Sequence, residues 1–213
     1  MDKRLKDHTV EEFMDVLAWP GGAPGGGSVC ALAGALGASG LVLVAKLTAN
    51  LKRFAHEAPL CEEIAGAAEP LMKSLTEGID RDTDCYNLIV AAYKLPKSNE
   101  EEIAVRKAAI ADATLKATEA PYRVLCESVE ALRLCNRLES HYNPVAASDF
   151  AAAVLQLRAA AKTAWHNVLA NLGGLANRER AEEMRSTGCA LHDEAMRISD
   201  ALVDSAERLL VEA

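Results

Sequence analysis

Apolar residues recur at helical spacing along almost the entire chain. The first group has four members: Val10, Phe13, Val16 and Leu17. Before them, Thr9 and Glu12 have the spacing of a capping box, in which a hydroxyl and a carboxylate satisfy free amides at a helix start. A short amphipathic helix is therefore predicted over residues 10–18.

A second, far more apolar segment follows a glycine-rich loop and is predicted to be helical from Ser28 to about Phe54. Its first part is uncharged and long enough to span a bilayer. Much of its apolarity comes from alanine, and glycine and serine dilute it, which favours a fully buried central helix over a membrane span. Three glycines recur along it: Gly34, Gly37 and Gly40. This row predicts close packing, either against a second subunit or against another helix of the same chain.

Four more helices are predicted. The first covers residues 58–93, the second runs from a cap at Ser98 to about Ser140, the third covers 149–172 and the fourth covers 177–211. Ser98 with Glu101 is expected to cap the second of these, and Ser148 the third. Pro70 is expected either to kink the helix over residues 58–93 or to separate a short first piece from it, and Pro121 is expected to kink the next helix. No strand pattern competes with this interpretation. The predicted fold is an all-α bundle of five or six mostly long helices in a single domain, residues 1–213.

Charge argues against one class of function and suggests a cellular location. The net charge of −8 argues against general nucleic-acid binding, because phosphate recognition requires a basic face. The first residues, MDKRLKDHTVEEF, carry charges where a secretory signal would have an apolar core. We therefore expect a cytoplasmic protein.

Neither the cysteines nor the histidines show the spacing of a metal site. The six cysteines are expected to be reduced thiols of the core: Cys30, Cys61, Cys85, Cys126, Cys135 and Cys189. The five histidines are His8, His56, His141, His166 and His192. No metal is therefore expected.

The glycine-rich loop before the apolar helix is the first candidate site. Its amides, from Gly25 to Gly27, precede Ser28 as the expected N-cap, and such a helix start binds anions or carbonyl oxygens. A phosphate loop is not indicated, because no strand precedes it and no lysine ends it. A simple linker or tight turn remains the alternative.

A second candidate lies within the predicted helix 58–93. Asp82 and Tyr86 share one helical face, and the apolar stripe draws Asp82 toward the buried side, whereas Asp80 and Asp84 need not be buried. A partly buried carboxylate can have its pKa raised into the range useful for proton transfer. A solvated acidic face is the alternative. Polar groups on the alanine-rich helix, Asp149, Asn167 and Asn171, are either structural or ligand-facing.

Several short motifs occur together, in order, over most of the chain. They are Glu12-Phe13, Leu17-Ala18, Pro24-Gly25-Gly26-Gly27-Ser28, the run Ala33 to Gly37, Leu47-Thr48, Asp82 with Tyr86, Ala92-Tyr93, Leu95-Pro96-Lys97, Asn143, Ser148-Asp149 and Asn167-Val168. In this combination the chain resembles the formiminotetrahydrofolate cyclodeaminase / methenyltetrahydrofolate cyclohydrolase family.

The resemblance implies an all-helical homodimer that binds a reduced folate and acts on a carbon–nitrogen bond of its one-carbon unit. One implied reaction closes formiminotetrahydrofolate to methenyltetrahydrofolate with loss of ammonia. The other adds water to methenyltetrahydrofolate and gives the formyl folate. Both pass through a tetrahedral carbon, so both require a proton shuttle in a polar pocket without a metal.

Roles for individual residues follow from the resemblance together with the residue patterns. Asp82 is the expected general acid/base, with Asp149 as the second choice. The substrate-binding candidates are the loop residues Gly25, Gly26, Gly27 and Ser28, then Tyr86, the pterin-edge candidates Asn143 and Asn167, and the basic residues Lys52, Arg53 and Lys97 for the glutamate tail.

The chain also departs from the family pattern. Ala23, Lys46 and Tyr142 stand where threonine, asparagine and glycine are usual, and Asn50 to Phe54 replaces a more basic stretch. A catalytically inactive helical protein that binds folate or serves assembly is therefore the alternative function.

Overall fold

The computed structural model describes residues 3–212, which contain six α-helices and no strand. The helices are α1 (Val10–Ala18), α2 (Gly26–Ala49), α3 (Ala58–Lys94), α4 (Glu100–Leu138), α5 (Ala147–Leu172) and α6 (Arg178–Glu212). Three short 3-10 helices accompany them: η1 (Leu5–Asp7) before α1, η2 (Lys52–Phe54) between α2 and α3, and η3 (Pro144–Ala146) between α4 and α5. The predicted all-helical architecture is confirmed.

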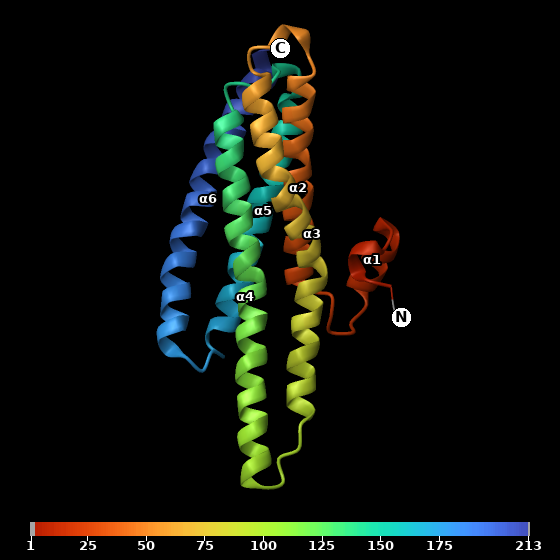
Figure 1. The fold of residues 1–213 in the computed structure, drawn as a ribbon, viewed down its shortest axis with the longest axis vertical. Coiled ribbons are helices and arrows are strands. Elements are labelled where there is room, and N and C mark those ends of the chain that lie inside the picture. The colour runs from red at the N-terminus through yellow and green to blue at the C-terminus, as the bar shows by residue number, and fades with distance from the viewer. Residues whose placement is uncertain (1–2, 213) are drawn as a thin grey trace.

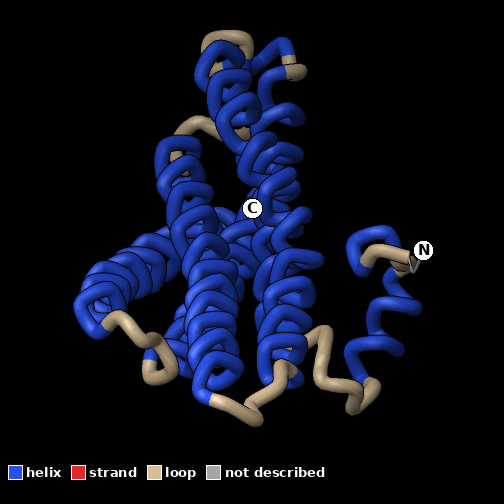
Figure 2. The backbone as a smooth tube through the Cα atoms, turned by 60° about the horizontal axis from the view of Figure 1, so that its bottom comes forward, coloured by secondary structure: helices blue, strands red, loops and turns tan. Residues whose placement is uncertain are grey.

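Helices α2 to α6 run up and down beside one another as an elongated bundle (Figure 1). Helix α2 lies between α3 and α5 and packs against both. Helices α3 and α4 continue past the start of α2 as a long hairpin, whereas α1 stands to one side of the bundle (Figures 1 and 2). The start of α2 therefore lies partway along the bundle, surrounded by side chains of longer helices.

Helix α1 has the predicted bounds, and the capping box of Thr9 and Glu12 is present. Only Phe13 of this helix is buried, while Val10, Met14 and Trp19 beside it are largely exposed. The preceding segment is held to α3 by Arg4, which donates to both carboxylate oxygens of Asp84 at 3.1 and 2.8 Å. The glycine loop thus connects a helix at the side of the bundle to its centre.

Helix α2 differs from its prediction in three ways. It starts at Gly26 with Gly25 as N-cap, so Ser28 lies inside the helix, and it ends at Ala49 rather than Phe54. It is also not fully buried, because one stripe of leucines faces outward. Leu36, Leu43 and Leu47 are 54%, 48% and 44% exposed. By length and composition α2 could cross a membrane, as buried helices of globular bundles also can.

The glycine row of α2 packs against α5 of the same chain. A Cβ on Gly37 would lie 2.8 Å from the carbonyl oxygen of Ala153 and 2.9 Å from the backbone nitrogen of Leu157, and one on Gly40 would lie 2.8 Å from Cβ of Ala153. Gly34 likewise approaches Ala160, also on α5. The intrachain alternative for this row is therefore correct, and the glycines let two helix backbones approach closely.

We expect Gly37→Ala to destabilise the protein by about 1–3 kcal/mol, because its methyl group meets backbone atoms of α5 that cannot move without shifting the helix. Urea unfolding followed by circular dichroism measures this change. Gly66→Ala is the matched control, since Gly66 lies in α3 with open space around its Cα. That variant should gain about 0.5–1 kcal/mol from helix propensity. Equal stability of the two variants would contradict the packing described here.

Two of the predicted helix caps are wrong. Asn99, not Ser98, caps α4, and its side chain accepts from the backbone N–H of Glu102. Helix α5 begins at Ala147 after the 3-10 turn of Pro144–Ala146, so Ser148 lies inside its first turn. The two internal prolines, Pro70 and Pro121, interrupt neither α3 nor α4.

The cysteines are all free thiols, as expected, but they are not all in the core. Four are buried: Cys30, Cys61, Cys85 and Cys135. Cys126 is partly buried, and Cys189 on α6 is exposed, which corrects the expectation for that residue.

Candidate active site

A pocket of about 190 Å³ lies at the start of α2. Its walls come from the glycine loop and from three helices, α3, α4 and α5. The lining residues are Gly22, Ala23, Gly25, Gly26, Gly27, Asp82, Tyr86, Ile89, Ala117, Asn167 and Asn171. The structure therefore brings together the loop, Asp82, Tyr86 and Asn167, which the sequence indicated as separate candidates.

Asp82 reaches from α3 to the first turn of α2. Its Oδ2 accepts from the backbone N–H of Ser28 at 3.0 Å and lies 3.3 Å from the Ser28 hydroxyl. That hydroxyl also donates to the carbonyl oxygen of Ile79 at 2.9 Å. The Ser28 side chain is therefore fully used inside the protein, and Asp82 caps the helix start from a neighbouring helix.

Gly27 is required for this contact. A Cβ on Gly27 would overlap the carboxylate of Asp82. The N–H groups of Gly26 and Gly27 belong to the free first turn of α2 and have no recorded acceptor within residues 3–212. The helix start therefore offers two donors beside a carboxylate that is both acceptor and potential proton carrier.

Burial raises the pKa of Asp82 above its ordinary value of 3.8, while the hydrogen bonds from the Ser28 hydroxyl and N–H oppose this rise. Burial dominates because removal of water disfavours the charged carboxylate. Asp82 remains partly exposed, on the wall of the pocket. A carboxyl in this setting can exchange a proton with a bound molecule near neutral pH more readily than an ordinary aspartate.

Asp80 is more deeply buried than Asp82, which the apolar stripe of α3 does not indicate. It is 3% exposed and accepts from the backbone N–H of Lys6 at 3.3 Å, with Nε of Arg4 also at 3.3 Å. Asp84 is exposed and pairs with the same arginine. Asp80 is buried because the N-terminal segment covers it, and this long-range contact has no signature in the local spacing.

The two asparagines of α5 line the same pocket as Asp82. The Nδ2 of Asn167 donates to the carbonyl oxygen of Thr163 at 2.8 Å, and a Cβ on Gly26 would lie 3.2 Å from that nitrogen. The Nδ2 of Asn171 donates to the carbonyl oxygen of Ala117 at 3.0 Å. Both side chains are thus fixed by backbone hydrogen bonds through Nδ2, and neither side-chain oxygen is used in these bonds.

Tyr86 closes the loop side of the pocket. Its hydroxyl lies so near Gly22 that a Cβ there would overlap it. Gly22 has φ 94°, a backbone conformation that favours glycine. The loop conformation and the ring of Tyr86 therefore depend on each other.

The remaining candidates lie elsewhere on the chain. Lys52, Arg53 and Asn143 are at the other end of α2, where Arg53 Nη2 donates to Asn143 Oδ1 and the N–H of Asn143 donates to Thr48 Oγ1 at 3.0 Å. Asp149 is exposed in the first turn of α5, at that same end. The single chain does not bring these four residues to the pocket.

Lys97 lies beyond the pocket in the other direction, in the turn of the α3–α4 hairpin. With Arg106 and Lys107 it lines a surface cavity of about 360 Å³ that also contains Ile103 and Ile110. Arg106 stacks on the ring of Tyr93. This basic cavity is the other location for an anionic substrate tail.

The three residues that depart from the family pattern lie in different places. Lys46 is exposed and pairs with Glu69 at 2.7 Å. Tyr142 is buried and stacks on Phe150 with ring centroids 4.4 Å apart. Of these three departures, only Ala23 lines the pocket.

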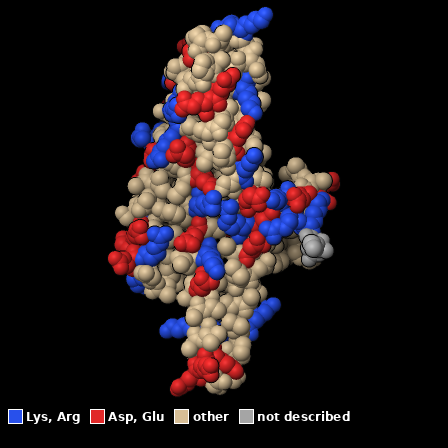
Figure 3. All heavy atoms as spheres, viewed as in Figure 1, with Lys and Arg blue, Asp and Glu red and all other residues tan. Residues whose placement is uncertain are grey.

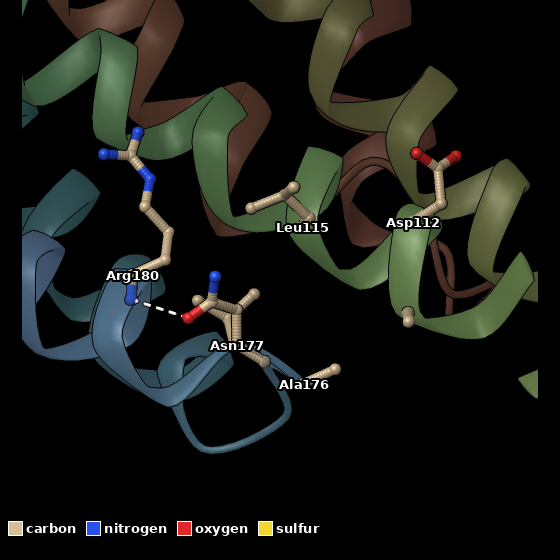
Figure 4. A pocket seen from close by; sticks show the side chains of 7 residues that line it. Asp112, Leu115, Ala176, Asn177 and Arg180 are labelled. Atoms are coloured by element: carbon tan, nitrogen blue, oxygen red, sulfur yellow. Dashed lines mark hydrogen bonds between the residues drawn. The ribbon is translucent and has the colours of Figure 1, made fainter. Parts of the chain in front are cut away.

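A further cavity of about 240 Å³ lies between α4 and the α5–α6 connection (Figure 4). Its walls are mostly apolar, and its charged groups are engaged, since Asp112 pairs with Lys116 and Arg180 with Glu183, each at 2.7 Å. Asn177 accepts from the backbone N–H of Arg180 at 3.0 Å, as the dashed line shows. The cavity has no free proton-transfer group, so the loop pocket is the better candidate for chemistry.

Side chains of both charges are mixed on the surface (Figure 3), so a charged ligand is attracted by local groups and not by one large patch of a single sign. Basic and acidic groups alternate over the face shown in Figure 3, and acidic groups gather at the hairpin tip, where α4 begins with Glu100, Glu101 and Glu102. Within residues 3–212, no group of three metal-ligating side chains converges.

Comparison with known proteins agrees with this geometry. Residues 9–188 match the family model described as formiminotransferase-cyclodeaminase. A methenyltetrahydrofolate cyclohydrolase of Methylorubrum extorquens is 33% identical over 177 residues, which are 83% of this chain and 85% of that protein. A formimidoyltransferase-cyclodeaminase of Gallus gallus is 27% identical over 91% of this chain, which spans only 36% of that longer protein.

The fold is also found in a solved structure. The crystal structure of formiminotetrahydrofolate cyclodeaminase from Thermotoga maritima superimposes with a TM-score of 0.78 over 98% of both chains, at 23% identity. The matched family region contains the glycine loop, Asp82, Tyr86 and both asparagines of the pocket. The chain belongs to the formiminotransferase-cyclodeaminase family.

Proposed function

We propose that the protein is a folate one-carbon enzyme that acts on a carbon–nitrogen bond, as a methenyltetrahydrofolate cyclohydrolase or a formiminotetrahydrofolate cyclodeaminase. The observation that carries the proposal is the carboxyl of Asp82, which lies partly buried on the wall of the loop pocket beside the free amides of α2. Family membership supplies the substrate class.

Five residues of the pocket have a part in this proposed chemistry. In the hydrolase direction, Asp82 takes a proton from the water that adds to the methenyl carbon. One carbon–nitrogen bond of the resulting tetrahedral carbon then breaks as its nitrogen receives a proton and the new hydroxyl loses one, which leaves the formyl group. In the deaminase reaction, a folate nitrogen attacks the formimino carbon and the departing ammonia receives a proton. The N–H groups of Gly26 and Gly27 and the carbonyl oxygens of Asn167 and Asn171 would orient the polar edge of the pterin ring.

The similarity covers 85% of the cyclohydrolase, which favours the hydrolase reaction over the deaminase reaction. The bifunctional relatives are covered over about a third of their length. A single experiment separates the reactions. Purified protein is given methenyltetrahydrofolate or formiminotetrahydrofolate, and the absorbance of the methenyl compound is followed. A fall with the first substrate identifies the hydrolase, and a rise with the second identifies the deaminase. Folate binding without either change would favour the non-catalytic alternative.

We also propose that the protein is a homodimer that buries the outward stripe of α2. Leu36, Leu43 and Leu47 lie on one face of this helix and are about half exposed, and large exposed apolar patches mark interaction surfaces.

A cytoplasmic location remains a prediction from the charged start of the sequence.

Leu43→Asp should convert the dimer to a monomer, because a charge at the centre of an apolar interface would be buried without a partner. Light scattering measures the mass, and circular dichroism checks that the helices remain. Val105→Asp is the control, since Val105 is 58% exposed on the α3–α4 hairpin away from this stripe. Dimers that persist unchanged in Leu43→Asp would refute this interface.

A further inference from the structure

The loop pocket of a single chain is incomplete for its proposed substrate. Its volume of about 190 Å³ lies below the roughly 300–1,000 Å³ of sites that enclose a whole drug-sized ligand. Its lining contains one carboxylate, Asp82, and no lysine or arginine. A folate carries its negative charge on the carboxylates of its glutamate tail, so a complete site requires a cation outside this lining.

Exposed cations lie at the opposite end of the same helix. Lys52 and Arg53 follow α2 directly, and both are exposed. Arg53 uses one nitrogen on Asn143, which fixes its position and leaves other donors free. Helix α2 has 24 residues, about 36 Å at 1.5 Å per residue, so these cations cannot reach the pocket of their own chain.

The outward face of α2 connects the two ends. Five apolar residues recur along it at helical spacing: Val29, Leu32, Leu36, Leu43 and Leu47. The stripe is centred near the middle of the helix. A two-fold axis perpendicular to α2 at that point would pair the stripe with its copy and place the end of each helix beside the start of the other. The pocket, whose lining has one carboxylate and no cation, would then meet the exposed cations Lys52 and Arg53 of the other copy.

We infer that each active site is completed by the partner subunit, whose Arg53, supported by Lys52, binds the carboxylate of the folate substrate at the mouth of the loop pocket. The inference depends on the proposed folate function for the identity of the ligand. The antiparallel arrangement does not depend on it. The two parts are therefore tested separately.

Cross-linking of the wild-type protein tests the arrangement without any activity. Lys6 pairs with Glu77, which is 19 residues, or about 28 Å, along α3 from Ala58 at the Lys52 end. A short amine-reactive cross-linker cannot bridge Lys52 and Lys6 within one chain. We expect Lys52–Lys6 or Lys52–Lys3 links in the dimer and none in the Leu43→Asp monomer. A dimer that links Lys52 to Lys52, or forms no Lys52–Lys6 or Lys52–Lys3 link, would overturn the arrangement.

Mixed dimers test the contribution of Arg53. Arg53→Ala alone should lower kcat/KM by about 10- to 100-fold, through loss of a charge-assisted contact to the substrate. Asp82→Asn alone should be nearly inactive. A heterodimer of the two variants, co-expressed with different tags and purified through both, contains one site with both wild-type residues. We expect it to have roughly half of the wild-type activity.

Activity of the heterodimer no greater than the mean of its two parents would show that Arg53 does not act across the interface. Lys97→Ala and Arg197→Ala are made in parallel. Lys97 tests the hairpin cavity, and Arg197 is an exposed arginine of α6 with no assigned role. A rise in KM for Lys97→Ala but not for Arg53→Ala would place the tail on the hairpin and overturn the inference. If the wild type turns over neither folate, the proposed function fails, and the cross-links still decide the arrangement.

Discussion

Asp82→Asn is expected to lower kcat by about 10²- to 10⁴-fold, the usual contribution of a general acid or base. Asparagine has nearly the same shape and keeps an oxygen that can accept from the N–H of Ser28, so the cap on α2 is retained. It cannot take up or release a proton. Steady-state kinetics with the substrate that the wild type converts measures the effect, and urea unfolding should show a change of about 1 kcal/mol or less.

Asp84→Asn is the matched control. Asp84 lies two positions away on α3, is exposed, and pairs with Arg4 rather than with the pocket. Its loss changes the charge of the protein by the same amount but should leave turnover within about twofold, since exposed ion pairs contribute little. Full turnover in a folded Asp82→Asn protein would remove Asp82 from the mechanism and leave Asp149, in the first turn of α5, as the remaining carboxylate candidate.

The pH dependence gives the direction of proton transfer. Burial raises the pKa of Asp82, so the wild-type rate should show a limb above pH 3.8 that the asparagine variant lacks. A rate that increases with pH through this limb identifies a base, as water addition requires. A rate that decreases identifies an acid, as departure of ammonia requires.

Stability should follow the same ionisation with a defined sign. Because the folded-state pKa is the higher one, the folded protein holds the proton more tightly than the unfolded chain does. The contribution of Asp82 to stability is therefore greatest at low pH and is lost as the pH rises through the raised pKa. Relative to Asp82→Asn, the free energy of unfolding of the wild type should decrease over that interval.

The sequence predicts the helices because each has an amphipathic period or a cap that acts locally. Thr9 and Glu12 locate α1 to the residue, since a capping box is a local motif. The same reasoning predicts caps at Ser98 and Ser148, and both predictions are wrong, because Asn99 caps α4 and a 3-10 turn precedes α5. Several polar residues near a helix start can each cap it, and the sequence does not rank them.

The site is predictable only in part, because its walls come from segments far apart in the chain. Helical phase predicts Asp82 on the buried side of its helix, but the sequence treats Asp82 and the glycine loop as separate candidates. The sequence could not show that Ile89 and Ala117 complete the wall, since apolar residues on long helices are indistinguishable from core. The sequence also could not show that Asn143, Lys52 and Arg53 lie far from the pocket. The order of the motifs along the chain does not reveal that the length of α2 separates them from it.

Gly27→Ala should abolish the arrangement that this site depends on. The added methyl group would occupy the place of the Asp82 carboxylate, and Gly27 cannot retreat because it lies in the first turn of α2. Asp82 must rotate away, which breaks its bond with the N–H of Ser28. We expect a loss of about 1–3 kcal/mol in the free energy of unfolding and a fall in kcat of roughly 10²-fold or more.

The neighbouring Gly25→Ala separates this contact from a general effect of the loop. A Cβ on Gly25 meets no atom within 4 Å, so that variant should keep its stability within about 0.5 kcal/mol. The double variant Gly27→Ala with Asp82→Asn gives a sharper result. If the methyl group acts by displacing the carboxylate, its effect on kcat should largely disappear once the carboxylate is gone, whereas independent effects would multiply. Multiplicative losses would mean that Gly27 serves the substrate directly, through its own N–H, and that Asp82 acts without its contact to the helix start.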